Sequence, residues 1–154
     1  MKIIIAGVSG SGKSTVGKLL AERLGCEFAD ADDYHPPENI AKMKAGIPLD
    51  DADRAGWLEA LGDHLASREN IVLACSALKR IYRDRLRGMA GPLEFFVLSL
   101  DKESLMQRLE SRDHFMPASL LDSQLATLEL GNDVKVIDNT LGAGEVAAGI
   151  AAGR

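Results

Sequence analysis

Short apolar runs recur along the chain and predict buried β-strands. Four of them are rich in β-branched or aromatic residues, which is typical of strands that are covered on both faces. A fifth run is weaker. The four strands are expected at 2–6 (KIIIA), 71–74 (IVLA), 93–98 (LEFFVL) and 134–137 (VKVI), and the weaker fifth at 26–29 (CEFA).

The segments between these runs carry apolar residues at helical spacing. Gly25 follows the first such segment, where a left-handed residue commonly ends a helix. A second helix is expected to begin near Asp50 or Asp51, whose carboxylate can accept from free backbone N–H groups. The apolar stripes of the expected helices are Val16, Leu20 and Leu24; Trp57, Leu58, Leu61 and Leu65; Leu105, Met106 and Leu109; Leu121, Leu125 and Leu128; and Val146 and Ile150.

Alternating strands and helices predict an α/β fold. Parallel strands need crossover connections, and right-handed crossovers place helices on both faces of the sheet. The chain contains no internal repeat and no linker rich in proline, glycine or serine. We therefore expect one three-layer α/β/α domain that spans residues 1–154.

Composition narrows the class of protein. The 154 residues are 46% hydrophobic and carry a net charge of −5, which excludes a disordered chain and argues against a protein that mainly grips nucleic-acid backbones. Cys26 and Cys75 have neither zinc-ligand nor disulfide-framework spacing. The run from Ile3 to Ala6 is too short for a signal-peptide core. We expect a cytoplasmic protein that binds neither nucleic acid nor a membrane.

A phosphate-binding motif follows the first strand directly. The residues Gly7, Val8, Ser9, Gly10, Ser11, Gly12, Lys13 and Ser14 satisfy the pattern G-x-x-x-x-G-K-[ST] and lead into a helix. Such a loop points backbone N–H groups at a polyphosphate. Lys13 is expected to reach the β- and γ-phosphates of a nucleoside triphosphate, Ser14 to ligate Mg²⁺, and Thr15 to extend the set of hydroxyl groups.

Acidic residues follow the predicted second strand, at the edge of the sheet where parallel folds bind ligands. A kinase that acts on an alcohol needs a carboxylate to orient the hydroxyl group and accept its proton, and we assign Asp32 to that role. Asp30 is expected to help hold Mg²⁺. Two roles are open for His35: it either binds the substrate or stabilises a turn.

Two isolated cations are candidates for anion binding. Arg54 stands among three aspartates, Asp50, Asp51 and Asp53, so it either forms a salt bridge or binds a substrate carboxylate with its forked guanidinium. Lys79 follows the third strand, where Cys75 replaces the aspartate of a second magnesium motif. Lys79 either binds an anion or lies on the surface.

A cluster of cations marks a candidate lid at about residues 108–120. Arg108, Arg112 and His114 surround a predicted helix break at Asp113 to Pro117. Cations that arrive on closure can stabilise the transferring phosphoryl group and exclude water. We assign Arg108 to the nucleotide, Arg112 to catalysis and His114 to the substrate. The alternative is a solvated helix end.

The chain resembles the P-loop gluconokinase family, whose members phosphorylate D-gluconate at its 6-hydroxyl group with ATP. The resemblance runs nearly end to end. It rests on GVSGSGKST (7–15), DADDYHPPENIAKMKAGIPLDDADR (30–54), CSALKRIYRDRLR (75–87) and RDHFMPASLLDSQLATLE (112–129). Two positions depart from the family pattern: Ala31 stands where glycine is common, and Gly56 where proline is common.

This resemblance carries further expectations. It implies a fold like that of shikimate kinases, with a five-stranded parallel sheet in the order 2-3-1-4-5, and an acceptor-binding segment at about residues 30–67. It implies that Asp32 and Arg54 face gluconate, and that Lys79, Arg83 and Gln124 belong to the substrate site. It also suggests a homodimer.

Two alternatives stay open. The first is a kinase for another small acid or polyol, such as shikimate. The second is a protein that hydrolyses its nucleotide slowly and signals through its conformation. No NKxD motif for reading guanine is present, which disfavours the second.

Overall fold

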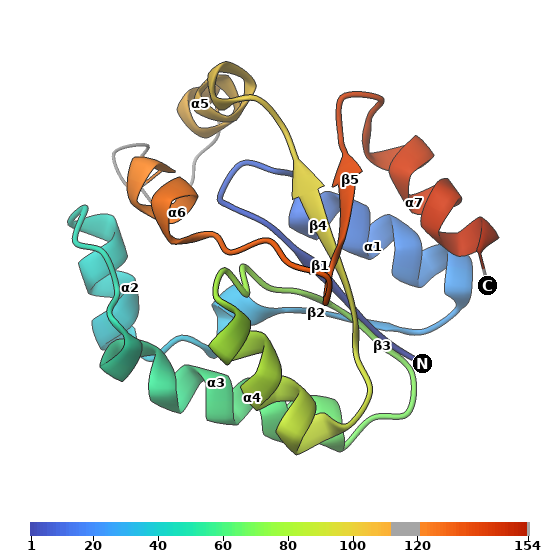
Figure 1. Ribbon diagram of the computed structural model, residues 1–154, viewed down its shortest axis with the longest axis horizontal. Helices are drawn as coiled ribbons and strands as arrows, with labels where there is room; N and C mark the ends of the chain where they lie inside the picture. The colour runs from blue at the N-terminus through green and yellow to red at the C-terminus, as the bar shows by residue number, and fades with distance from the viewer. Residues whose placement is uncertain (112–120, 154) are drawn as a thin grey trace.

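Five parallel strands form the centre of the molecule. The computed structural model describes residues 1–111 and 121–153. The sheet has the order β2-β3-β1-β4-β5, which the resemblance implied (Figure 1). Three strands begin and end one residue later than the apolar pattern predicted. The strands are β1 (Lys2–Ala6), β2 (Glu27–Asp30), β3 (Ile71–Ala74), β4 (Glu94–Ser99) and β5 (Lys135–Asp138).

Helices cover both faces of the sheet, so the predicted three-layer α/β fold is confirmed. Helices α1 and α7 pack together on one face, and α3 and α4 on the other (Figure 1). Helices α5 and α6 lie beyond the carboxyl end of β4. The helices are α1 (Lys13–Leu24), the 3-10 helix η1 (Ala31–Tyr34), α2 (Pro37–Lys44), α3 (Asp51–Ala66), α4 (Arg80–Ala90), α5 (Lys102–Ser111), α6 (Leu121–Thr127) and α7 (Ala143–Ala152).

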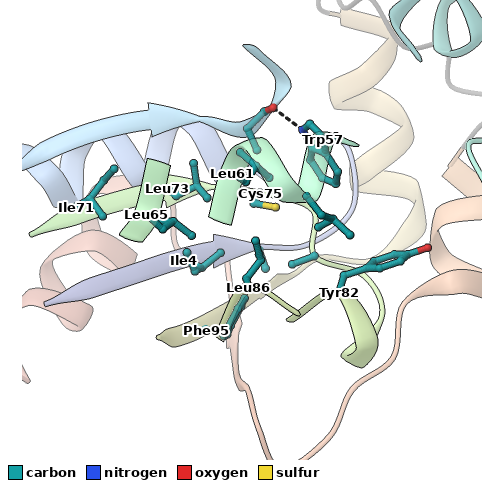
Figure 2. Packing of buried hydrophobic residues seen from close by; sticks show 14 of the residues in the cluster. Ile4, Trp57, Leu61, Leu65, Ile71, Leu73, Cys75, Tyr82, Leu86 and Phe95 are labelled. Carbon is teal, nitrogen blue, oxygen red and sulfur yellow. Dashed lines mark hydrogen bonds between the residues drawn. The ribbon is translucent and has the colours of Figure 1, made fainter. Parts of the chain in front are cut away.

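Strand β1 divides the core into two halves because successive side chains point to opposite faces of a sheet. Ile3 and Ile5 belong to the half under α1 and α7, whereas Ile4 belongs to the half under α3 and α4. Figure 2 shows the second half, where Trp57 donates from its indole Nε1 to the carbonyl oxygen of Ala31 at 2.7 Å. This bond ties α3 to the start of η1, directly beside the candidate catalytic aspartate.

A third apolar cluster joins the glycine loop to α5 and α6. Val8 packs with Leu105 and Leu109 of α5 and with Leu121 of α6, all of them buried. Within the described residues, no helix has both the length and the apolar character that crossing a bilayer requires. The apolar cluster around Val8 holds α5 and α6 against the glycine loop.

Helices α2 and α4 were not among the helices that the apolar pattern predicted. In α4 the buried residues are Tyr82, Arg83 and Leu86, so an arginine occupies the face that packs on the sheet. A charged residue at such a position breaks the apolar stripe by which a helix is recognised in sequence. Helix α2 is only eight residues long and buries few side chains.

Candidate active site

The loop after β1 has a backbone conformation that depends on glycine. Gly7, Gly10 and Gly12 have φ angles of 135°, 84° and 97°, where residues with a Cβ are rarely found. A Cβ on Gly12 would also lie 2.6 Å from Nδ2 of Asn139, and one on Gly7 would lie 2.8 Å from Oγ of Ser11. The predicted phosphate-loop motif thus has the glycine-dependent path that a phosphate-binding loop needs.

Side chains from several elements hold the outside of this loop. Lys13 donates from Nζ to the carbonyl oxygen of Val8 at 3.1 Å. Asn139 donates to the carbonyl oxygen of Ser11 at 2.8 Å, and Gln124 accepts from the backbone N–H of Ser9 at 2.7 Å. These bonds link the loop to α6 and to the end of β5.

Asp30 connects the glycine loop to the acidic segment. Its Oδ2 accepts from the hydroxyl group of Ser14 at 2.5 Å, and its Oδ1 accepts from the backbone N–H of Asp32 at 3.0 Å. The second bond caps η1, which fixes the backbone from which Asp32 projects. Asp30 and Ser14, the two residues that were predicted to hold Mg²⁺, are therefore in direct contact.

The carboxyl group of Asp32 has an unusual environment. Burial raises its pKa to about 6, with smaller contributions from Asp30 and Asp33, while the charge of Lys13 acts in the opposite direction. Burial likewise lowers the pKa of Lys13, against the attraction of Asp32, Cys75 and Asp30. A carboxyl group with a pKa near neutrality is suited to general base catalysis.

One pocket brings the glycine loop and the acidic segment together. Asp32, His35 and Arg54 line it beside Lys13 and Ser14. Helix α6 contributes Gln124, as expected, and also Ser123 and Thr127, which the sequence had not indicated. The remaining wall consists of Ser9, Gly10, Gly12, Met43, Pro48, Leu49, Trp57, Ser76 and Leu78. Nine of the predicted site residues thus line one pocket.

Arg54 is anchored through one of its nitrogens. Nη1 donates to the carbonyl oxygen of Leu49 at 2.7 Å and to the hydroxyl group of Tyr82 at 3.0 Å. Within residues 1–111 and 121–153, neither Nε nor Nη2 makes a hydrogen bond, and no carboxylate forms a salt bridge with this side chain. The salt-bridge alternative for Arg54 therefore finds no partner in the described part of the chain.

Lys79 and Arg83 do not line the pocket. Lys79 forms an ion pair with Asp51 at 3.1 Å and is half-buried. Arg83 is fully buried, and its guanidinium donates to Asp133 and to the carbonyl oxygens of Ala77 and Leu78. The guanidinium of Arg83 thus supports the loop after β3, and the expected place of this residue in the substrate site stays a prediction.

The predicted lid lies largely outside the described residues, and this includes both Arg112 and His114. Arg108 lies within the described part and contacts the carbonyl oxygen of Gly10 at 3.4 Å. Asn139 also contacts the glycine loop and was missed. A lone asparagine after a strand carries no sequence signal for such a role.

Fold and site together define a class. The glycine loop lies between β1 and α1 of a fold whose sheet has the order 2-3-1-4-5, and it faces an aspartate and an arginine across a pocket. This is the arrangement of a P-loop kinase for small acceptors. The family described as the AAA domain matches residues 3–117. A gluconokinase from Gluconobacter oxydans is 51% identical over 88% of this chain and 79% of its own length, and the thermosensitive gluconokinase of Escherichia coli is 46% identical over 82% and 70%.

Solved structures agree with these relatives. A crystal structure of a gluconokinase from Sinorhizobium meliloti superposes with a TM-score of 0.89 at 48% identity, and covers 99% of this chain and 90% of that chain. Shikimate kinase from Aquifex aeolicus has a TM-score of 0.66 at 20% identity, over 97% and 94%, and shares the fold. The chain belongs to the gluconokinase family.

Proposed function

We propose that this protein transfers the γ-phosphoryl group of ATP to the 6-hydroxyl group of D-gluconate, which gives 6-phospho-D-gluconate and ADP. The observation that carries the proposal is the single pocket in which the glycine loop, Asp32 and Arg54 meet. Relatives named gluconokinase, at 41–51% identity, support this choice of acceptor.

The two ends of gluconate need different partners. Its carboxylate calls for a cation with a planar pair of donors, and Arg54 has Nε and Nη2 available in the described structure. Its 6-hydroxyl group calls for a proton acceptor, which Asp32 supplies. On the nucleotide side, the loop amides and Lys13 bind the phosphates and offset the charge that spreads over the transferring oxygens.

The residues present suit Mg²⁺. This ion prefers hard oxygen ligands and commonly takes only one or two from the protein. Ser14 and Asp30 offer a hydroxyl and a carboxylate oxygen 2.5 Å apart beside the loop. Within the described residues, no group of three or more His, Cys, Asp or Glu side chains could enclose a metal ion. Mg²⁺, when bound, neutralises phosphate charge, and these two residues would hold it.

Two segments complete the proposal. Residues of about 30–67 form the acceptor-binding segment, because Asp32, His35 and Arg54 all come from it and line the pocket. The predicted lid at about residues 108–120 lies largely outside the described residues; within them, Arg108 contacts the loop at Gly10. Both belong to a single kinase domain that needs no separate substrate domain.

An acceptor panel tests the proposal. ADP formation is measured with ATP, Mg²⁺ and gluconate, shikimate or neutral polyols, and we expect kcat/KM to be highest for gluconate. A higher kcat/KM for shikimate would identify shikimate, and not gluconate, as the acceptor. ADP formation that is unchanged by every small acceptor but increases with an added protein would favour the nucleotide-switched binding protein.

The first prediction concerns the catalytic base. Asp32→Asn should lower kcat by about 100-fold or more, because the variant cannot accept the hydroxyl proton, whereas ATP should still bind. The matched control is Asp33→Asn, which changes the neighbouring exposed carboxylate. Single-turnover measurements with saturating gluconate provide the comparison, and a near-normal kcat for Asp32→Asn would exclude this residue as the base.

A further inference from the structure

His35 stands at the end of η1, on the wall of the pocket that also holds Asp32 and Arg54. Its imidazole stacks on the indole of Trp57, with ring centroids 4.3 Å apart and planes within 9° of parallel. Trp57 is itself fixed, because it is 1% exposed and bonded to the carbonyl oxygen of Ala31 (Figure 2). The plane of the imidazole is therefore set by the core.

Asn39 determines which imidazole nitrogen carries the proton. Its side chain is buried, and its Nδ2 donates to the carbonyl oxygen of Asp53 at 2.8 Å, which fixes the orientation of the amide. The same Nδ2 lies 3.2 Å from Nδ1 of His35. An amide nitrogen can only donate, so Nδ1 must accept, and the neutral ring carries its proton on Nε2.

The surroundings keep this ring neutral. Burial is the main cause and the charge of Arg54 the second, and together they lower the pKa of His35 to about 4. Among the described residues, Asp32 and Lys13 share the pocket with His35, and the carboxylate of Asp53 is bound to Lys42 at 2.8 Å. At neutral pH the ring thus adds a hydrogen-bond donor without a second positive charge beside Arg54.

We propose that His35 is a specificity-determining residue that donates its Nε2–H to a hydroxyl oxygen of the acceptor. Asn39 is the positioning residue that keeps the proton on Nε2. The proposal rests on the proposed function, because it names one contact of the acceptor in the same pocket. In this arrangement Arg54 binds the carboxylate of the acceptor through its charge, and His35 binds a hydroxyl group through a directional hydrogen bond.

Two substitutions distinguish the effect of the Nε2–H donor from the effect of removing the imidazole ring. His35→Gln places an amide nitrogen near the position of Nε2 and keeps a donor there. His35→Asn places its oxygen near the position of Nδ1, which keeps the contact with Asn39 and removes the donor. Both replace the aromatic ring and so lose its stacking on Trp57. His64→Asn, on the far part of α3, is the control for replacing a histidine.

We expect the gluconate KM to rise about 10-fold in His35→Asn and to return to within about threefold of the original protein in His35→Gln, with the ATP KM unchanged in both. Equal gluconate KM values for His35→Asn and the original protein would overturn the proposal. Loss of gluconate turnover by the original protein would instead count against the proposed function, so the two failures are distinguishable.

A spectroscopic measurement tests the tautomer without turnover. In the ¹⁵N-labelled protein at pH 7, the two-bond ¹⁵N–¹H correlations of His35, assigned by their loss in His35→Gln, should show a proton on Nε2 alone. Asn39→Asp should move that proton to Nδ1, and should raise the gluconate KM relative to the original protein more at pH 8 than at pH 6, because protonation of the ring at the lower pH restores the Nε2–H donor. A ring protonated on Nδ1 in the original protein would overturn the proposal.

Discussion

Tyr82 lies between two cations at the entrance to α4. The guanidinium of Arg54 is 5.3 Å from the centre of its ring and the ammonium of Lys79 is 5.6 Å from it. Its hydroxyl group donates to Asp51 and accepts from Arg54. Tyr82 therefore positions Arg54, and does so through one hydroxyl group and the face of one ring.

Removal of that hydroxyl group should loosen Arg54 without unfolding the site. In Tyr82→Phe the ring still packs in the core, but Nη1 of Arg54 keeps only the carbonyl oxygen of Leu49. We expect the gluconate KM to rise about fivefold with kcat and the ATP KM nearly unchanged. Steady-state kinetics of both substrates measure this, with Tyr34→Phe, outside the pocket, as the control. A gluconate KM that does not move would show that Tyr82 has only a packing role.

At the residue scale, sequence reasoning works where a motif or an isolated charge fixes the chemistry. Lys13, Ser14 and Asp32 lie in patterns whose spacing relates them to a phosphate or a hydroxyl group, and they line one pocket. Arg83 shows where it stops working. Its partner Asp133 is 50 residues away, and no local pattern states whether an arginine is solvated, buried or aimed at a ligand.

Helix α3 links the acceptor side of the pocket to the core. It begins with a capping box in which Asp50 accepts from the backbone N–H of Asp53 at 2.7 Å, and Asp53 accepts from that of Asp50 at 3.0 Å. Arg54 follows at once, and Trp57 and Leu61 are buried one and two turns later. The helix start predicted near Asp50 is confirmed. It could be predicted because a helix cap depends on residues that lie close together in the sequence.

Substitution of the cap should cost stability. Asp50→Ala leaves the N–H of Asp53 without its acceptor, and we expect the free energy of unfolding to fall by about 1 kcal/mol. Glu59→Ala removes an exposed charge from the same helix and should change it by less than about 0.5 kcal/mol. Urea unfolding followed by circular dichroism compares the two. Equal effects of Asp50→Ala and Glu59→Ala would mean that the cap contributes little.

At the scale of the whole molecule, the net charge of −5 conceals an uneven distribution. Lys13 and Arg54 line the pocket, whereas the buried pair of Arg83 and Asp133 joins α4 to the segment before β5. Apolar periodicity in the sequence predicted the three layers, and the resemblance to a known family implied the order of the strands. Neither predicted this long-range pair, because burial of a charge depends on how distant segments meet.

The pair should make stability depend on acidity. Hydrogen bonding by Arg83 is the main cause that lowers the pKa of Asp133 from 3.8 to about 2 in the folded protein. A lowered folded-state pKa contributes stability above the unfolded value of 3.8, and that contribution is lost as the pH falls from about 4 toward 2. We expect Asp133→Asn to lower the free energy of unfolding by about 3 kcal/mol at pH 7, because it leaves a buried arginine poorly paired.

Urea unfolding at pH 7 and at pH 3 measures this effect. The difference between Asp133→Asn and the original protein should shrink at the lower pH, where the unfolded chain of the original protein has taken up a proton at Asp133. Asp84→Asn changes an exposed partner of Arg87 and should have little effect at either pH. A difference that stayed constant with pH would contradict the assigned role of the carboxylate.

The glycine loop and the acceptor wall differ in what they are made of. The loop presents its backbone in a path that three glycines permit, whereas the opposite wall presents the side chains of Asp32, His35 and Arg54. Mutation replaces side chains and leaves backbone atoms in place. New acceptors can therefore be explored by substitution along η1 and α3 while nucleotide use is inherited unchanged, which makes this pocket a favourable starting point for redesign toward other hydroxy acids.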